Sequence, residues 1–246
     1  MTDSSRPHLL GLLAGLFLAA GLVLSAMLVT RAWMRIAESQ TIVVTRSARK
    51  NVRSDLIVWR GSFAAEAGAL LEAQQQLKTD LAKVEAFLKA KGVPDFFLTP
   101  ISIQELQATL KGTDGSLQRK TAGYRLTQTV QINSEDVERI TQLDRDSSAL
   151  VEQGVLFTPV ATEYIYTKAG DTKVEMLAEA TKDARARAEQ IAAQGGRLIA
   201  QLRAAKMGVF QITPVHSLQT SWDGINDTTS LEKTITAVVT ATFSLK

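Results

Sequence analysis

Apolar residues follow one another without a charge from Leu9 to Thr30, and this run is the strongest feature of the hydrophobic pattern. At about 1.5 Å per residue a helix over the run spans roughly 33 Å, enough to cross the hydrocarbon core of a bilayer. A helix is required because lipid offers no partner to an unpaired backbone amide. The sequence therefore predicts a lipid-embedded helix through residues 9–30. Large side chains in it or just beyond it are the expected anchor: Leu9, Leu16, Phe17, Leu24, Val29 and Trp33.

Two other interpretations of this run stay open. A cleaved signal peptide has a shorter apolar stretch, and the best small-residue cleavage site, around Ser25–Ala26, lies inside the run. A buried helix of a soluble protein usually carries polar positions, of which this run has no charged one and only Ser25 and Thr30. An uncleaved signal anchor fits best. The expected division is a tail and anchor over 1–38 and an extracytoplasmic domain over 39–246.

The orientation of the anchor depends on two opposing arguments. Arg6 precedes the run while Arg31, Arg35 and further basic residues follow it, and this count opposes export of the C-terminal part. Long domains, however, translocate largely regardless of charge, and the short tail resembles the start of a signal sequence. We therefore expect the N-terminus inside. The reverse orientation would give a cytoplasmic adaptor tethered to the membrane.

After the anchor the pattern changes several times between the period of a strand and the period of a helix. The expected strands cover 41–45, 56–65, 98–111, 123–132, 157–166, 202–217 and 233–245. Turns are expected at Lys50-Asn51 and over 112–122. Helices are expected over 67–91, from an Asn133-Ser134 cap to Gly154, and over 172–194, where Gly195-Gly196 ends the helix.

The order strand, long helix, strand, strand occurs twice, at about 56–132 and 157–245. Hairpins and crossing helices of this kind indicate an α+β fold, with helices packed on a mixed or antiparallel sheet. Apolar or small residues of the last helix define its expected inward face: Val174, Leu177, Thr181, Ala184, Ala188 and Ile191. Alanine at these positions would let the helix backbone lie close to the sheet.

Composition excludes several classes of function. The formal charge of +3 gives no concentrated basic face for nucleic acid. The chain has no cysteine and two histidines, one of them in the N-terminal tail, so thiolate chemistry is excluded and a histidine-based site would rest on His216 alone. No phosphate-binding, nucleophile-elbow or zinc-protease motif is present. We expect no enzyme activity, no metal and no cofactor, and the sequence identifies no small-molecule ligand. The alternative is a ligand-binding or enzymatic envelope domain with a pocket at the end of the sheet, which would need convergent polar groups that the linear sequence does not show.

The two tryptophans that follow the anchor, Trp59 and Trp222, differ in their surroundings. Trp59 alternates with Ile57 and is expected in the core. Trp222 lies in a polar loop, where it either packs over a sheet edge or anchors a contact between subunits. The candidate oligomer contacts are Trp222 and Ile225 in that loop and Thr240 and Thr242 on the last strand.

Four segments together resemble one protein family. The first is TIVVTRSARKNVRSDLIVWRGSFAAEA, from residue 41, and the second is GYRLTQTVQINSEDVERI, from residue 123. The third, EATKDARARAEQIAAQGG, contains an Ala-x-x-Asp-Ala-Arg-x-Arg-Ala-Glu helix, and the fourth is the closing strand DTTSLEKTITAVVTATFSLK. In this order they resemble SIMPL-domain proteins.

The resemblance implies an α+β fold and a periplasmic or envelope location in a Gram-negative bacterium. It also implies ring- or channel-like homo-oligomers and a loose link to stress defence and antigenicity. The family has no agreed catalytic residues, so none is transferred to this sequence.

Overall fold

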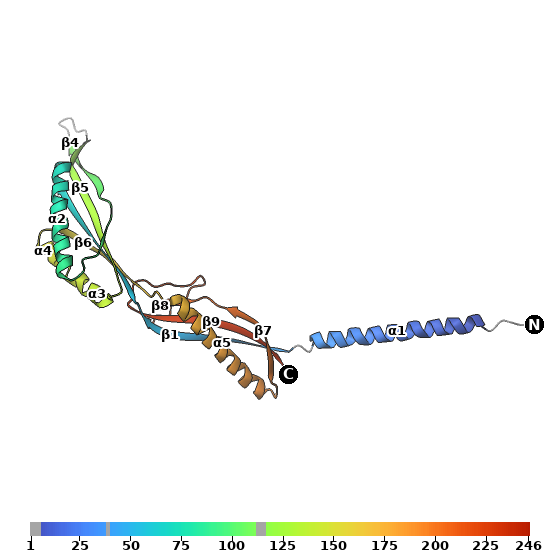
Figure 1. The fold of residues 1–246 in the computed structure, drawn as a ribbon. Coiled ribbons are helices and arrows are strands. Elements are labelled where there is room, and N and C mark those ends of the chain that lie inside the picture. Colours follow the sequence, from blue (N-terminus) through green and yellow to red (C-terminus); the bar gives the residue numbers. More distant parts are fainter. Residues whose placement is uncertain (1–5, 38–39, 112–116) are drawn as a thin grey trace, which may run out of the picture. The chain divides into compact units, whose positions relative to one another are not determined.

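The computed structural model describes residues 6–37, 40–111 and 117–246 (Figure 1). Its helices are α1 (Arg6–Ala37), α2 (Leu70–Ala90), α3 (Val137–Asp146), α4 (Ala149–Glu152) and α5 (Ala169–Gln194). Its strands are β1 (Thr41–Arg53), β2 (Leu56–Ala67), β3 (Phe97–Leu98), β4 (Ser102–Lys111), β5 (Leu117–Ser134), β6 (Leu156–Ile165), β7 (Ile199–Met207), β8 (Gln211–Pro214) and β9 (Glu232–Leu245). The predicted α+β class with an N-terminal apolar helix is confirmed.

By its contacts the chain divides into two compact units. One consists of Met1–Ala48, Leu177–Gly208 and Val238–Lys246, and the other of Arg49–Met176 and Val209–Ala237. Three of the four boundaries between the units fall inside β1, α5 and β9, and the fourth lies between β7 and β8.

The larger unit contains a five-stranded antiparallel sheet in the order β3-β5-β2-β6, with β4 paired to β5. Strand β2 has hydrogen-bonded neighbours on both sides, and its residues Ile57, Trp59, Phe63 and Ala65 form one core cluster with side chains of α2, α3 and α4. Ile57, Trp59 and Phe63 are fully buried on β2, so the prediction that Trp59 belongs to the core is confirmed.

Trp59 combines a packing role with a polar one. Its ring stacks on Phe157 of β6, with centroids 6.1 Å apart, and its Nε1 donates to Asp144 Oδ1 at the end of α3 (2.6 Å). A buried indole N–H needs such a partner, because leaving it unpaired costs about 1–3 kcal/mol. This bond therefore fixes α3 against β2.

The second sheet has the order β1-β9-β7, with β8 paired to β9. Along β9 the side chains alternate: Ile235, Ala237, Val239 and Ala241 are buried, while the threonines between them are half-exposed. In the smaller unit Ala241 and Phe243 pack against Ala184 and Ala188 of α5 and Val44 of β1. Alanine on α5 permits this close approach of the helix to the sheet, as predicted.

Several strand boundaries differ from the prediction. No turn occurs at Lys50-Asn51: β1 continues to Arg53, and the chain turns at Ser54-Asp55. The strand expected over 202–217 is two strands, β7 and β8, and the strand expected over 98–111 is likewise divided into β3 and β4. Strand β5 already begins at Leu117, within the turn expected over 112–122, and residues 112–116 of that turn lie outside the described residues.

The helices need two corrections. The expected helix from the Asn133-Ser134 cap to Gly154 is broken into α3 and α4, and Asp136 caps α3 by accepting from the Arg139 N–H at 3.1 Å. On α5 the expected inward residues Val174 and Ile191 are 70% and 50% exposed. The buried positions instead recur every four residues: Thr172, Met176, Ala180, Ala184, Ala188 and Ala192. The alanine-lined stripe moves around α5 along its length, so a fixed helical face chosen from the sequence missed its two ends.

Gly61 of β2 is expected to tolerate no side chain. A Cβ at this position would overlap the Phe157 ring and crowd Trp59. Gly61→Ala should lower the free energy of unfolding by about 1–3 kcal/mol, because overpacking displaces both rings. Gly68→Ala is the control, since a Cβ at Gly68 has open space around it. Urea unfolding in detergent checks this, and equal stability of the two variants would contradict the packing described.

Candidate functional site

Helix α1 carries the predicted membrane anchor. Leu16, Phe17, Leu24, Val29 and Trp33 all expose their side chains, and Leu9 lies in the helix but outside the described side chains. Within the described residues one helix, over Gly11–Met34, is long and apolar enough to cross a membrane, and none of it is buried by the rest of the chain. Such a surface matches a lipid environment.

The segment after β8 contains two of the predicted oligomer contacts. Trp222 is 88% exposed, so it does not pack over a sheet edge within its own chain. Ile225 is half-buried, and its carbonyl accepts from the Ile212 N–H of β8 (2.7 Å). The other two predicted contacts, Thr240 and Thr242, belong to the smaller unit, where the hydroxyl of Thr240 bonds that of Thr45 on β1 (2.9 Å).

A buried ion pair holds this segment in place. Lys233, at the start of β9, has a side chain that is 1% exposed, and its Nζ lies 3.4 Å from Asp227 Oδ2 and also donates to the Asp227 carbonyl. Asp227 Oδ1 in turn accepts from the N–H and the hydroxyl of Thr229 (2.9 and 2.8 Å). Burying two charges is favourable only when their remaining hydrogen bonds are satisfied, which is the case here. The segment that carries Trp222 therefore has a fixed end.

The pKa values of both partners follow from this burial. Burial acts to raise the pKa of Asp227, but hydrogen bonds from Thr229 and Ser230 and the charge of Lys233 outweigh it and lower the pKa to about 2. Burial lowers the pKa of Lys233, and Asp227 offsets only part of that effect. The carboxylate is thus stabilised in its ionised form mainly by its hydrogen bonds, with the ammonium as a partner.

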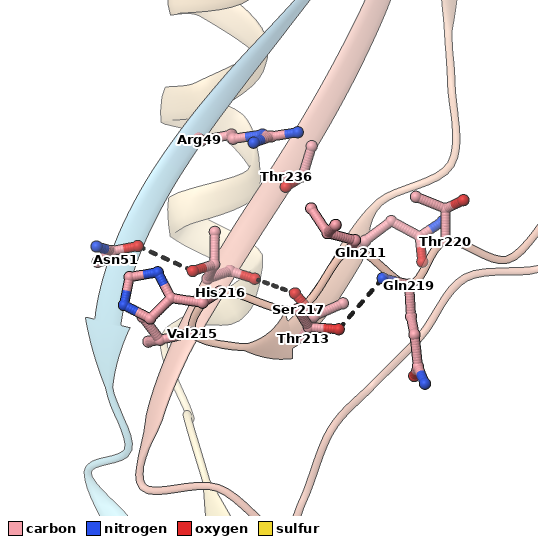
Figure 2. Close-up of a pocket in the computed structure, with 12 residues that line it drawn as sticks. Arg49, Asn51, Gln211, Thr213, Val215, His216, Ser217, Gln219, Thr220 and Thr236 are labelled. Atoms are coloured by element: carbon pink, nitrogen blue, oxygen red, sulfur yellow. Dashed lines mark hydrogen bonds between the residues drawn. The ribbon is translucent and has the colours of Figure 1, made fainter.

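A polar pocket lies beside the same segment (Figure 2). It has a volume of about 410 Å³ and is lined by side chains of β1, β8 and β9 and by the 215–220 loop. Its strand residues are Arg49, Asn51, Gln211, Thr213, Thr234 and Thr236. All of them belong to the larger unit.

Strand register explains why these residues meet. Gln211 of β8 lies opposite Thr236 of β9, and Thr213 lies opposite Thr234. Alternate residues of a strand share a face, so all four project to the same side of the sheet, opposite to buried Ile235. The Thr234 hydroxyl donates to Asn51 Oδ1 (2.9 Å), which links β9 to β1 across this face.

Gln211 forms part of the pocket wall and is 6% exposed. Its Nε2 donates to the Ser221 carbonyl (2.6 Å), whereas its Oε1 is a buried acceptor without a hydrogen-bond partner in the part of the chain that the structure describes. An unpaired buried acceptor costs about 1–3 kcal/mol. The pocket wall thus retains an acceptor able to take a donor.

The 215–220 loop closes the pocket with an unusual backbone. His216 has a φ of 66°, a left-handed conformation that is uncommon for residues other than glycine. The turn is held by the Ser217 N–H, which donates to the Pro214 carbonyl (3.0 Å), and by the Gln219 N–H, which donates to Ser217 Oγ (3.2 Å). In Figure 2 the His216 ring and Asn51 appear together on one side of the view, with Gln211 and Thr220 on the other.

Sequence reasoning did not find this pocket. In the sequence Arg49 is one of several basic residues that follow the anchor, and Gln211 lies inside the strand expected over 202–217. The alternation of threonine along β9 was visible in the sequence, but it did not reveal which strands would lie beside it. Among the described residues, no cluster of three or more His, Asp or Glu side chains is placed to hold a metal ion.

In the residues that the structure describes, an α+β domain follows one N-terminal helix that is apolar enough to span a membrane. A family model described as SIMPL, a protein of unknown function, matches residues 42–243, which include both sheets and the pocket. The chain therefore belongs to the SIMPL family, and the resemblance seen in the sequence is confirmed. No curated protein matches the chain.

The buried ion pair makes a testable contribution to stability. Because folding lowers the pKa of Asp227, its ionised carboxylate stabilises the fold above about pH 4, and this contribution is lost as the pH falls from about 4 towards 2. Asp227→Asn should therefore lower the free energy of unfolding at pH 7 by about 2–4 kcal/mol, since it leaves the Lys233 charge buried and unpaired.

Urea midpoints of the full-length protein at pH 7, 4, 3 and 2.5 measure this effect. The difference in urea midpoint between wild type and Asp227→Asn should become smaller as the pH falls below about 4. The control is Asp223→Asn, which changes an exposed carboxylate in the same segment and should leave the midpoints unchanged. A gap that stays constant down to pH 2.5 would contradict the proposed role of the carboxylate.

Proposed function

We propose that this chain is a non-enzymatic SIMPL protein, anchored in the inner membrane of a Gram-negative bacterium, with its α+β domain in the periplasm. There it self-assembles into a ring- or channel-like homo-oligomer that contributes to envelope stress defence. The proposal rests on membership of the SIMPL family, the exposed apolar helix α1 and the exposed indole of Trp222.

The anchor is supported by the surface of α1. Leucine, valine and phenylalanine are exposed on all sides of the helix over residues 11–34, and the two polar side chains of the uncharged run, Ser25 and Thr30, bond back to carbonyls of the helix itself (2.9 and 2.8 Å). Polar side chains in a bilayer need such internal partners. A helix of this kind is costly to expose to water and is stable in lipid.

The periplasmic location is supported by the family and by the length of the domain. Arg31 and the basic residues after it favour retention inside, but the segment to be exported is long, and charge controls the translocation of long segments only weakly. If the orientation is reversed, the same structure describes a cytoplasmic domain tethered to the membrane.

Self-assembly is carried by one observation, the exposure of Trp222 on a fixed segment. Hydrogen bonds from Gln211 to the Ser221 carbonyl and from Ile212 to the Ile225 carbonyl hold the chain on both sides of the indole. Tryptophan contributes more binding energy than most residues when it is buried at an interface. A bulky apolar side chain held outward in this way is suited to a subunit contact.

Membrane anchoring would strengthen such a contact. Copies of the chain that share a bilayer meet at a high effective concentration, so modest interfaces can close a stable ring. Ile225, Thr240 and Thr242 are the further candidates for these interfaces, and Thr240 and Thr242 lie on the half-exposed face of β9.

Topology is tested with alkaline phosphatase fused to the C-terminus, because this enzyme is active only after export. We expect an active fusion in cells. A matched fusion that lacks residues 1–38 should be inactive, since it has no export signal. An inactive full-length fusion would overturn the periplasmic location and favour the tethered cytoplasmic adaptor.

Assembly is tested on the full-length protein in detergent by light scattering and particle imaging. Wild type should form a closed oligomer. Trp222→Ser should raise the protein concentration at which the oligomer dissociates by at least about tenfold, because the lost contact contributes more than about 1.4 kcal/mol to the binding free energy. Trp222→Phe, which keeps an aromatic side chain, is the matched control and should remain assembled. A monomeric wild type, or two variants that behave alike, would refute the role of Trp222.

A further inference from the structure

We propose that the polar pocket between β1, β8, β9 and the 215–220 loop binds a small organic anion that carries several hydroxyl groups. Sugar acids and sugar phosphates have this chemistry. The proposal goes beyond self-assembly, and it rests on charge, hydrogen-bonding groups and size.

Charge is the first argument. The side chains that line the pocket include the permanent cation Arg49 and no carboxylate. Three neighbouring basic residues of β1 all reach acidic partners: Arg46 contacts Asp183 (2.6 Å), Lys50 contacts Glu175 (2.7 Å) and Arg53 contacts Glu138.

Arg49 differs from these neighbours. Within the described ranges its guanidinium forms no ion pair with a carboxylate, although it lies on the same strand. A guanidinium is always charged at neutral pH and matches the geometry of carboxylate and phosphate groups. An anionic group of a ligand is therefore the natural partner for Arg49 in this pocket.

Hydrogen-bonding groups are the second argument. Hydroxyl and amide side chains of Thr213, Thr234, Thr236 and Asn51 line the sheet side of the pocket, and Val215 and Leu218 add apolar surface on the loop side. The buried Gln211 Oε1 lacks a donor within the described part of the chain. Pockets that select a ligand place a few polar groups of this kind on a fixed frame. The Thr234 hydroxyl already donates to Asn51 Oδ1 (2.9 Å), and the Thr213 hydroxyl to the Thr234 carbonyl (3.4 Å). A ligand with several hydroxyl groups can therefore donate to the oxygens of Thr213, Thr234 and Asn51 and accept from Thr236.

The frame of the pocket is fixed by strand pairing. Register between β8 and β9 sets the four sheet residues, and the bond from Gln211 Nε2 to the Ser221 carbonyl (2.6 Å) holds the Gln211 amide. The 215–220 loop, with His216 in the left-handed region, forms the opposite wall. Residues held in such conformations are concentrated at binding sites.

Size is the third argument. A volume of about 410 Å³ lies at the small end of the range for ligand pockets, which extends from about 300 to 1,000 Å³. It suits a molecule the size of a monosaccharide rather than a polymer. Together the three arguments define the class as a polyhydroxylated carboxylate or phosphate ester.

Calorimetric titration of the full-length protein in detergent tests this class directly. The probes are gluconate and glucose 6-phosphate, with neutral glucose and inorganic phosphate as comparisons. We expect at least one of the two polyhydroxylated anions to bind. Glucose and inorganic phosphate should each bind at least about tenfold more weakly, because each lacks one of the two features recognised.

Variants locate the site. Arg49→Gln should weaken binding of the anion by at least about tenfold, and Thr236→Val, which keeps the shape of the side chain, should weaken it several-fold. Arg203→Gln is the matched control, since Arg203 is an exposed arginine of β7 outside the pocket. It should bind as wild type does. If Arg49→Gln does not fold, Thr236→Val and the conservative Arg49→Lys carry the test.

Three results would overturn the proposal. No binding of gluconate or glucose 6-phosphate at about 10 mM, far weaker than ordinary ligand affinities, would remove the site. Inorganic phosphate that binds as tightly as glucose 6-phosphate would show a simple anion site. Unchanged binding in Arg49→Gln would place the ligand elsewhere. The oligomeric state of the same samples is measured separately, so failure of this proposal is distinct from failure of self-assembly.

Discussion

The alternation of side chains along β9 is the constraint on which most of the structure depends. Every second residue, from Lys233 to Phe243, is buried on one face, and the threonines between them are half-exposed on the other. Because the period of a strand is two residues, a slip of one position would place the threonines in the core and the apolar residues outside. The packing of Ala241 and Phe243 against α5, and the position of Thr234 and Thr236 in the pocket, both follow from this single register.

The same strand also fixes the segment between β8 and β9. Lys233 lies on the buried face of β9, and its ion pair with Asp227 holds the end of a segment whose other end is attached to β8 through Gln211. Between these two points the chain presents Trp222 to the outside, and the 215–220 loop that precedes them lines the pocket. The exposed indole and the pocket thus belong to one short stretch of chain, which the strands β8 and β9 support.

Patterns of local origin were predictable from the sequence. The apolar run after Leu9, the alternation of β9 and the glycine pair that ends α5 depend only on neighbours along the chain, and the structure has each of them close to where it was expected. The prediction that Val174 and Ile191 lie on the inward face of α5 is wrong, because both side chains are largely exposed. A single helical face assumes that the helix lies parallel to its support, whereas the buried stripe of α5 moves around the helix by a step every four residues.

The sequence by itself determined an N-terminal helix apolar enough to span a membrane, an α+β domain and membership of the SIMPL family. Hydrophobic period and segment order are local properties of the chain, so they can be read along it. Tertiary structure alone decided which side chains meet. Arg49, Gln211 and Thr236 are distant in sequence, and only the order β1-β9 with β8 beside β9 brings them to one pocket. Arg46, Lys50 and Arg53 form ion pairs with residues far along the chain. Arg49 lies on the same strand but lines the pocket, and this difference also depends on the tertiary structure. Strand pairing joins residues through space, and a linear pattern carries no record of the partner.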